Sequence, residues 1–348
     1  MNKTMNNTSK TTKLLKGIKT IVIILLIVIV GFICLNELFI VFESFLPNEI
    51  QYMVNDDQRT CVVTGAEYSN RMIITIPKEI DGYTVVEIAP GAFKNYKMQV
   101  VILPDSIVKI GDSAFYSCKN LGRIHGIQAC NSLVSIGESA FERCQSLTSM
   151  KLPNNIEVIG ERAFYGCTMW FNAIIPQSVQ QIGNLAYAAC FATKEIHIPK
   201  SVKTIGNMAF YGCEKLTNIF VEDENPYWSS VDGVLYDKEV KTLYSYPSGR
   251  KNEVFMIPEG VENIYYRAFA FNMNLTEITL PSTIKAIGEE VFITAERFKV
   301  KIETVNYNGT VEMWQAIDKP KNWGQYSSDF IIYCTDGQIA KDGTVTYN

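Results

Sequence analysis

The sequence predicts an α/β solenoid, a right-handed superhelix with a curved parallel sheet and about 23 residues in each coil, preceded by one transmembrane helix. Three observations predict this fold. An Ile-Gly pair returns at a nearly constant interval, each interval contains one apolar segment of period two and one of period three to four, and a long apolar stretch follows a lysine-rich N-terminus. The predicted order is a cytoplasmic basic tail (residues 1–17), a transmembrane signal anchor with a juxtamembrane segment (18–45), an N-terminal β cap (46–87), the repeats (88–303) and a C-terminal cap (304–348).

The N-terminal stretch has the features of a membrane anchor. The apolar segment "IVIILLIVIVGFICL" (residues 21–35) continues past Asn36 and Glu37, so residues 18–42 are long enough to cross a hydrocarbon core of about 30 Å. The lysine excess before it predicts a cytoplasmic N-terminus and an extracytoplasmic remainder. We expect an uncleaved anchor in the cell membrane, because no small-residue cleavage site follows, and secretion after signal cleavage is the alternative. The lysines that precede the segment are Lys3, Lys10, Lys13, Lys16 and Lys19.

The Ile-Gly pair marks an internal repeat. Its successive steps are 22, 26, 23, 23, 23, 59 and 23 residues, which places one coil within the range of about 20 to 29 residues that leucine-rich repeats have. Coils this short can bury apolar side chains only against neighbouring coils, so both ends need caps. The pairs that carry the repeat are Ile88-Ala89, Ile110-Gly111, Ile136-Gly137, Ile159-Gly160, Ile182-Gly183, Ile205-Gly206, Ile264-Tyr265 and Ile287-Gly288.

Each coil divides into a strand and a turn. The segments "LTSMKLP" (147–153), "EIHIP" (195–199) and "EITLP" (277–281) alternate apolar and polar residues before a proline, as a half-buried strand does. In "IEVIGERAFYGC" (156–167) the apolar residues lie three and four apart, which indicates a short helical or irregular turn on the opposite side, with the glycine turning the chain.

The 59-residue step contains an inserted segment. "VDGVLYDKEVKTLYSYP" (231–247) predicts a hairpin, so residues 222–258 are expected to form an elaborated rung of the solenoid and not a free loop. We expect its tyrosines to pack within the protein.

The cysteines fall into two groups. Stacked coils would place the five that share one repeat position in a column about 5 Å apart, with parallel side chains that disfavour disulfides. Asn272 has the same position, so we interpret the column as small buried residues that meet unsatisfied backbone groups. A disulfide among Cys61, Cys130 and Cys334 stays open. The column contains Cys118, Cys144, Cys167, Cys190 and Cys213.

The sequence offers little for catalysis. Its two histidines, His125 and His197, lie three coils apart, about 14 Å at strand spacing, which is too far to share a metal ion. There is no nucleophile elbow, HExxH motif or glycine-rich phosphate loop. We therefore expect no enzyme, metal or cofactor, with an unrecognised active site as the alternative. The net charge of −4 argues against nucleic acid as a partner.

The outward positions of the strands give the candidate binding residues. Apolar and aromatic side chains alternate there with basic ones, a composition that protein interfaces favour. We therefore expect the concave sheet to bind an extracellular or surface protein, or a surface glycan. A solvated sheet with scattered apolar residues is the other interpretation, and the oligomeric state is open. The candidates are Ile102, Arg123, His125, Lys151, Ile174, Glu195, His197 and Phe220.

Three quoted segments connect the chain to a known family. "IGNMAFYGCEKLTNI" (205–219), "ENPYWSSVDGVLYDKEVKTLYSYP" (224–247) and "YNGTVEMW" (307–314) resemble the repeat and the recurring segments of the BspA-type leucine-rich repeat family of bacterial and parasite surface proteins. The resemblance covers the chain from about residue 70 to the C-terminus. It implies a curved solenoid exposed at a cell surface, acting in adhesion or in binding host or neighbouring-cell proteins. It names no ligand, and an envelope spacer without a ligand is the alternative.

Overall fold

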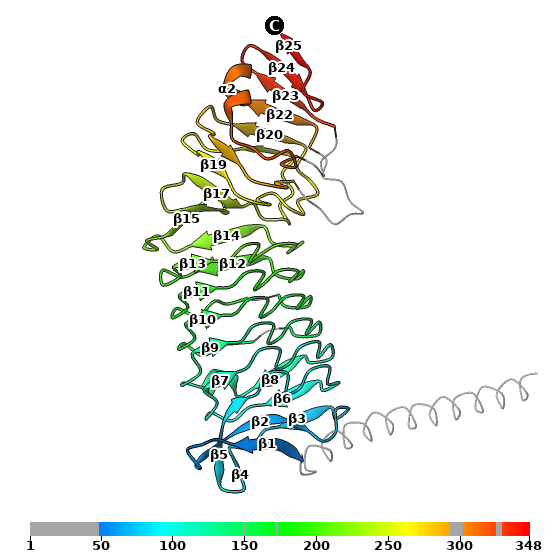
Figure 1. Ribbon diagram of the computed structural model, residues 1–348, viewed down its shortest axis with the longest axis vertical. Coiled ribbons are helices and arrows are strands. Elements are labelled where there is room, and N and C mark those ends of the chain that lie inside the picture. Colours follow the sequence, from blue (N-terminus) through cyan, green and yellow to red (C-terminus); the bar gives the residue numbers. More distant parts are fainter. Residues whose placement is uncertain (1–48, 149, 172, 293–301, 325–328) are drawn as a thin grey trace, which may run out of the picture. The chain divides into compact units, whose positions relative to one another are not determined.

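The computed structural model describes residues 49–348, except residues 149, 172, 293–301 and 325–328 (Figure 1). Asn48–Asn348 form one compact unit. The predicted basic tail and transmembrane segment (1–45) lie outside the described residues. Among the residues that the structure does describe, no helix has the length and apolar character of a membrane span.

Most coils contribute strands to two faces. We call the face of the repeated pair the Ile-Gly face, and the face that the sequence predicts as concave the proline face. The Ile-Gly face, with its N-terminal extension, contains β1 (Ile50–Val54), β2 (Thr60–Ala66), β4 (Glu79–Ile80), β5 (Tyr83–Ile88), β7 (Lys109–Ile110), β9 (Ser135–Ile136), β10 (Val158–Ile159), β11 (Gln181–Ile182), β13 (Thr204–Ile205), β19 (Asn263–Ile264) and β21 (Ala286–Ile287). The proline face, with its C-terminal extension, contains β3 (Ile73–Thr75), β6 (Val100–Ile102), β8 (Arg123–His125), β12 (Glu195–Ile198), β14 (Asn218–Val221), β18 (Val254–Met256), β20 (Glu277–Leu280), β22 (Thr304–Tyr307), β23 (Ile331–Cys334), β24 (Gly337–Ala340) and β25 (Val345–Tyr347).

The parallel register confirms the period of about 23 residues. Ser135 pairs with Val158, Val158 with Gln181, and Gln181 with Thr204, so each partner lies 23 residues further along the chain. Figure 1 shows these coils lying one on the next. The isoleucine of each pair is buried except Ile205, which is partly buried, and the core of each coil is completed by its neighbours.

Of the two expected forms of the turn, the structure has the irregular one and not the helical one, so the fold is a β-solenoid and not an α/β solenoid. On the side between the two faces, alternate backbone amides donate to the following coil: Ser139 to the carbonyl of Glu161 at 2.8 Å and Phe141 to that of Ala163 at 2.8 Å. These bonds replace the bonds to the fourth preceding residue that a helix requires. Ser139 also has a positive φ of 53°. Within the described residues the helical segments are α2 (Val311–Ala316) and the 3₁₀ turn η1 (Ile127–Ala129).

The glycines of the repeated pair allow close stacking and do not turn the chain, contrary to the sequence interpretation. Gly160, Gly183 and Gly206 lie outside the left-handed region of φ. A Cβ atom on Gly183 would lie 2.5 Å from the backbone nitrogen of Glu161, and one on Gly206 would lie 2.3 Å from that of Asn184. Two backbones therefore approach here to a distance that no side chain permits.

Among the described residues, the strands of the proline face fall into three sheets, where the sequence predicts one curved sheet. β3, β6 and β8 form one sheet, β12 and β14 a second, and β18 begins a six-stranded third. Between β8 and β12, Ile174 forms one isolated bridge with His197. Trp170 fills the core position that Leu147 and Leu216 hold in other coils, and its larger ring is buried there.

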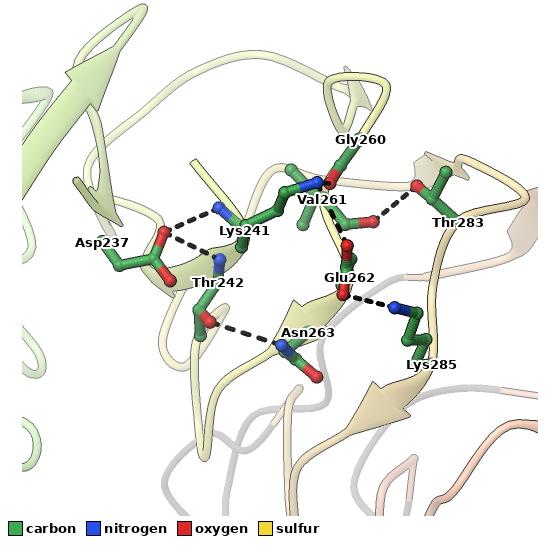
Figure 2. A network of polar contacts seen from close by, with 9 residues as sticks. All are labelled: Asp237, Lys241, Thr242, Gly260, Val261, Glu262, Asn263, Thr283 and Lys285. Atoms are coloured by element: carbon green, nitrogen blue, oxygen red, sulfur yellow. Dashed lines mark hydrogen bonds and ion pairs between the residues drawn. The ribbon is translucent and has the colours of Figure 1, made fainter. Parts of the chain in front are cut away.

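The inserted segment forms β15 (Trp228–Val231), β16 (Val234–Asp237) and β17 (Thr242–Ser245), which pair antiparallel. Figure 2 shows the polar contacts that hold this segment to the following coils. Asp237 Oδ1 accepts from the amides of Lys241 at 2.6 Å and Thr242 at 3.0 Å. Glu262 lies 3.1 Å from Lys241 Nζ and 2.6 Å from Lys285 Nζ, so one carboxylate joins three successive rungs.

Candidate functional site

The eight candidate residues are all solvent-exposed in the structure. The residues of β8 are exposed, buried and exposed in turn, and those of β12 alternate in the same way, because successive side chains of a strand point to opposite sides. Two other outward positions of the sequence interpretation, residues 149 and 172, lie outside the described residues. The candidates are placed as follows: Ile102 on β6, Arg123 and His125 on β8, Glu195 and His197 on β12, Phe220 on β14, and Lys151 and Ile174 in the two coils between β8 and β12.

The register brings four of the candidates together. His197 pairs with Ile174 on one side and with Phe220 on the other. The imidazole stacks on the Phe220 ring, with centroids 5.0 Å apart and planes at 29°. Glu195 Oε2 lies 3.7 Å from His197 Nε2. Ile102 and His125 pair with each other in the neighbouring sheet, so the candidates form two groups and not one continuous site.

A hollow of about 540 Å³ lies beside the first group. Phe171, which sequence analysis missed, lines it together with Ile174 and His197. Phe171 is 58% exposed, Ile174 54% and Phe220 38%. Phe171 precedes the alternating part of its coil, so the strand pattern did not mark it. The signal that could have found it is "MWF" (169–171), three large apolar residues where other coils place one leucine.

The far rim of the hollow carries a fixed carboxylate. Glu222 accepts a hydrogen bond from Gln177 Nε2 at 2.6 Å and another from the backbone amide of Lys200 at 2.9 Å. The bond from Gln177, followed by that from the Lys200 amide, holds the pKa of Glu222 below its ordinary value. Lys200 Nζ instead binds Glu224 at 2.8 Å. Glu222 is therefore a negative charge at neutral pH, without a lysine side chain bonded to it.

Comparison with known proteins identifies the family of this solenoid. The model of the BspA type leucine rich repeat region matches residues 86–217 and 244–313, in six copies. The chain belongs to the BspA-type leucine-rich repeat family. The unmatched residues 218–243 contain most of the inserted hairpin. No curated protein sequence matches the chain.

Solved structures of other bacterial proteins show the same fold. A leucine rich cell surface protein from Faecalibacterium prausnitzii is 23% identical, with a TM-score of 0.59 over 79% of this chain and 97% of its own. The pneumococcal vaccine antigen PcpA is 22% identical, with a TM-score of 0.64 over 76% and 81%. A leucine-rich repeat protein from Bacteroides ovatus is 21% identical, with a TM-score of 0.56 over 83% and 78%. At these identities the likeness is one of fold.

The cysteine column of this BspA-type chain is structural. Each thiol donates to a carbonyl oxygen of the preceding coil, and the eight cysteines that the structure describes are free thiols, including Cys61, Cys130 and Cys334. Asn272 makes the same kind of contact, from Nδ2 to the carbonyl oxygens of Pro247 and Arg250 at 3.3 Å each. The bonds run from Cys118 to Phe93 at 3.0 Å, Cys144 to Phe115 at 3.2 Å, Cys167 to Phe141 at 3.3 Å, Cys190 to Phe164 at 3.3 Å and Cys213 to Tyr187 at 3.2 Å.

The same burial makes these thiols poor nucleophiles. Desolvation raises the pKa of Cys144, Cys167 and Cys190 well above the ordinary value, because a buried thiolate loses its water. The described residues that line the hollow include no Ser, Thr or Cys beside His197. Nowhere in the described part of the chain do three His, Cys, Asp or Glu side chains gather as a metal site would require. The described side chains of this BspA-type face offer exposed rings, aliphatic groups and fixed charges.

Proposed function

We propose that this protein binds another protein through its proline face, with the hollow beside His197 as the centre of the contact. The observation that carries the proposal is the concentration of Phe171, Ile174 and the stacked His197 and Phe220 pair on one exposed surface. Burying one such side chain on association gains about 1.5–3 kcal/mol, before the cost of association is subtracted. An exposed apolar cluster with charged groups at its margin is typical of an interaction site.

A protein surface fits this hollow better than a glycan does. Ile174 lines the hollow with an aliphatic side chain, and an aliphatic group offers a sugar hydroxyl no hydrogen bond. Aromatic side chains next to aliphatic ones are the usual anchors of protein interfaces. A surface glycan that depends on Glu195, Glu222 and Gln177 is the alternative outcome of the binding experiment.

We also propose that residues 18–45 anchor the chain in a membrane and that the repeats act outside it, without a catalytic role. The lysine-rich N-terminus and the apolar stretch support the anchor, with secretion as the alternative. The cell-surface description of the Faecalibacterium prausnitzii protein supports the extracytoplasmic location. The test is protease accessibility of the repeats in intact cells that express the full-length chain.

The decisive experiment compares three purified full-length proteins as bait for proteins of neighbouring cells and of extracellular matrix. These are the unchanged chain, the double variant Ile174→Asp/Phe220→Asp, and the control variant Val134→Asp. Val134 is 49% exposed on the Ile-Gly side, so the control adds a charge at similar exposure away from the hollow. We expect the double variant to lose at least about 30-fold in affinity for a recovered partner, as loss of hot-spot residues does, and the control to retain it. Equal affinity of all three proteins would remove the assignment to the proline face.

A further inference from the structure

We propose that the protein bound at the proline face is a second copy of this chain, related to the first by a two-fold axis through the hollow. This inference rests on the proposed function and names its partner. It follows from the distribution of charge along the face, which changes sign on the two sides of the hollow.

The part of the face that precedes the hollow is basic. Arg123 and His125 project from β8, and Lys151 projects from the next coil, all three exposed to solvent. The acidic residue at this end, Asp105, lies 2.9 Å from Lys78 and is thereby neutralised. The excess charge on this half of the face is positive.

The part that follows the hollow is acidic. Glu222 is held ionised at the rim, and Glu253 and Glu303 are exposed in the coils that follow. Glu277 on β20 is half-buried and accepts a hydrogen bond from Asn306 at 2.7 Å. Because Lys251 is exposed beside Glu253, the described residues of this half contain both signs, but the carboxylates outnumber the lysine.

Apolar side chains occupy the middle of the face. Phe171 and Ile174 line the hollow, Phe220 stacks on His197 beside it, and Val254 and Met256 follow on β18, with Met256 68% exposed. Inside a protein interface this arrangement gives an apolar centre and charged ends. Such a centre has no partner within the described part of the chain.

Two copies of this face place opposite charges against each other only when the coils of one copy run in the opposite direction to those of the other. A two-fold axis makes residue i of one copy face residue j of the other and residue j face residue i. An axis through the hollow therefore places Arg123 and Lys151 of each copy opposite Glu253 and Glu277 of the other. A parallel arrangement would place like charges together, and juxtaposed like charges oppose association strongly.

The experiment measures the mass of the full-length chain by sedimentation equilibrium over a range of micromolar concentrations. We expect a reversible dimer that weakens as salt is raised, because exposed ion pairs are screened. The double variant Ile174→Asp/Phe220→Asp should be a monomer. A dimer that persists in this variant would show association through another segment, such as the apolar N-terminus, and would overturn the proposal.

Charge reversal provides the sharper test. The variants Arg123→Glu/Lys151→Glu and Glu253→Lys/Glu277→Lys should each dimerise at least about tenfold more weakly, because each meets its own charge. An equimolar mixture of the two should recover the parent affinity, since every reversed residue then faces an opposite one. Lys203→Glu, an exposed charge change on the Ile-Gly face, should leave the dimer unchanged.

The outcomes separate this inference from the proposed function. A chain that is monomeric at every concentration, or a mixture that fails to recover affinity while both variants keep the parent's melting temperature, would overturn the second copy as partner. If a different protein then bound the unchanged chain and was lost in Ile174→Asp/Phe220→Asp, the proposed function would stand without it.

Discussion

Cys144 Sγ lies 3.2 Å from the carbonyl oxygen of Phe115, one coil earlier, and donates a hydrogen bond to it. The thiol is buried and its contact recurs in each coil that has a cysteine at this position. A small side chain with one weak donor thus satisfies a buried carbonyl and fills the corner of the coil at once.

Replacing Cys144 by alanine should lower the free energy of unfolding by about 1–3 kcal/mol, because the carbonyl of Phe115 loses its partner and a small cavity forms. We expect Cys144→Asn to lower the free energy of unfolding as well, because asparagine occupies this position at Asn272, in the coil that follows the inserted hairpin. Urea denaturation of the two variants gives both values. An alanine variant as stable as the parent would show that the thiol contact adds nothing.

Thiol reactivity should separate the cysteines of the native protein. Cys334 is half-buried, whereas Cys144, Cys167 and Cys190 are buried in the core with raised thiol pKa values. We expect iodoacetamide to label Cys334 first and the column only after denaturation. Peptide mapping without prior reduction should find no disulfide within the column. Rapid labelling of Cys167 in the folded protein would contradict its placement.

Gly183→Ala tests the role of the repeated glycine. The added methyl group would lie 2.5 Å from the backbone nitrogen of Glu161, so the coils must separate, at a cost of about 1–3 kcal/mol. Gly122→Ala is the matched control, because its methyl group would meet its nearest neighbour at 3.5 Å, an ordinary contact. Thermal unfolding should show a lower midpoint for Gly183→Ala alone. Equal midpoints would mean that the coils do not require a glycine at this position.

The repeat could be predicted from sequence because every coil reuses the same positions. Ile136, Ile159 and Ile182 return at a fixed interval, and that interval is the register of the sheet. The backbone contacts between coils could not be predicted in this way. A glycine that allows the backbones of two coils to touch and a glycine that turns the backbone look alike in sequence. The structure places Gly183 against Glu161.

The exposed positions of the candidate site could be predicted from the sequence in the strands whose side chains alternate between exposed and buried. His197 and Phe220 occupy outward positions of β12 and β14, so their exposure followed from alternation, and their stacking follows from the register. Phe171 precedes the alternating part of its coil, where the pattern gives no direction for a side chain.

The pair of Glu142 and Arg162 gives a prediction about acid stability. Glu142 is buried and accepts two bonds from the guanidinium, each 2.9 Å, and one from Ser139 at 2.8 Å. Burial of the carboxyl alone would raise its pKa, but the bonds from Arg162 and then Ser139 outweigh this and hold the pKa of Glu142 below its ordinary value. The pair therefore stabilises the protein fully above the unfolded-state pKa of about 4.3, and this contribution is lost as the pH falls through the lower, folded-state pKa.

Glu142→Gln should accordingly destabilise the protein by about 1–3 kcal/mol at pH 7, less than for a fully buried pair because Arg162 is partly exposed. Between about pH 5 and the acid transition, the unfolding midpoint of Glu142→Gln should depend less on pH than that of the parent.

Arg162→Leu should lower the free energy of unfolding at pH 7 by more than Glu142→Gln does, because it leaves a buried carboxylate unpaired. The backbone tolerates leucine at this position, since Leu185 holds it one coil later with a φ of 55°, against 53° for Arg162. Lys109→Gln, which removes an exposed partner of Glu87 at 2.8 Å, is the control and should change stability by less than about 1 kcal/mol. Parallel pH profiles for the parent and Glu142→Gln would mean that this carboxyl does not titrate on unfolding.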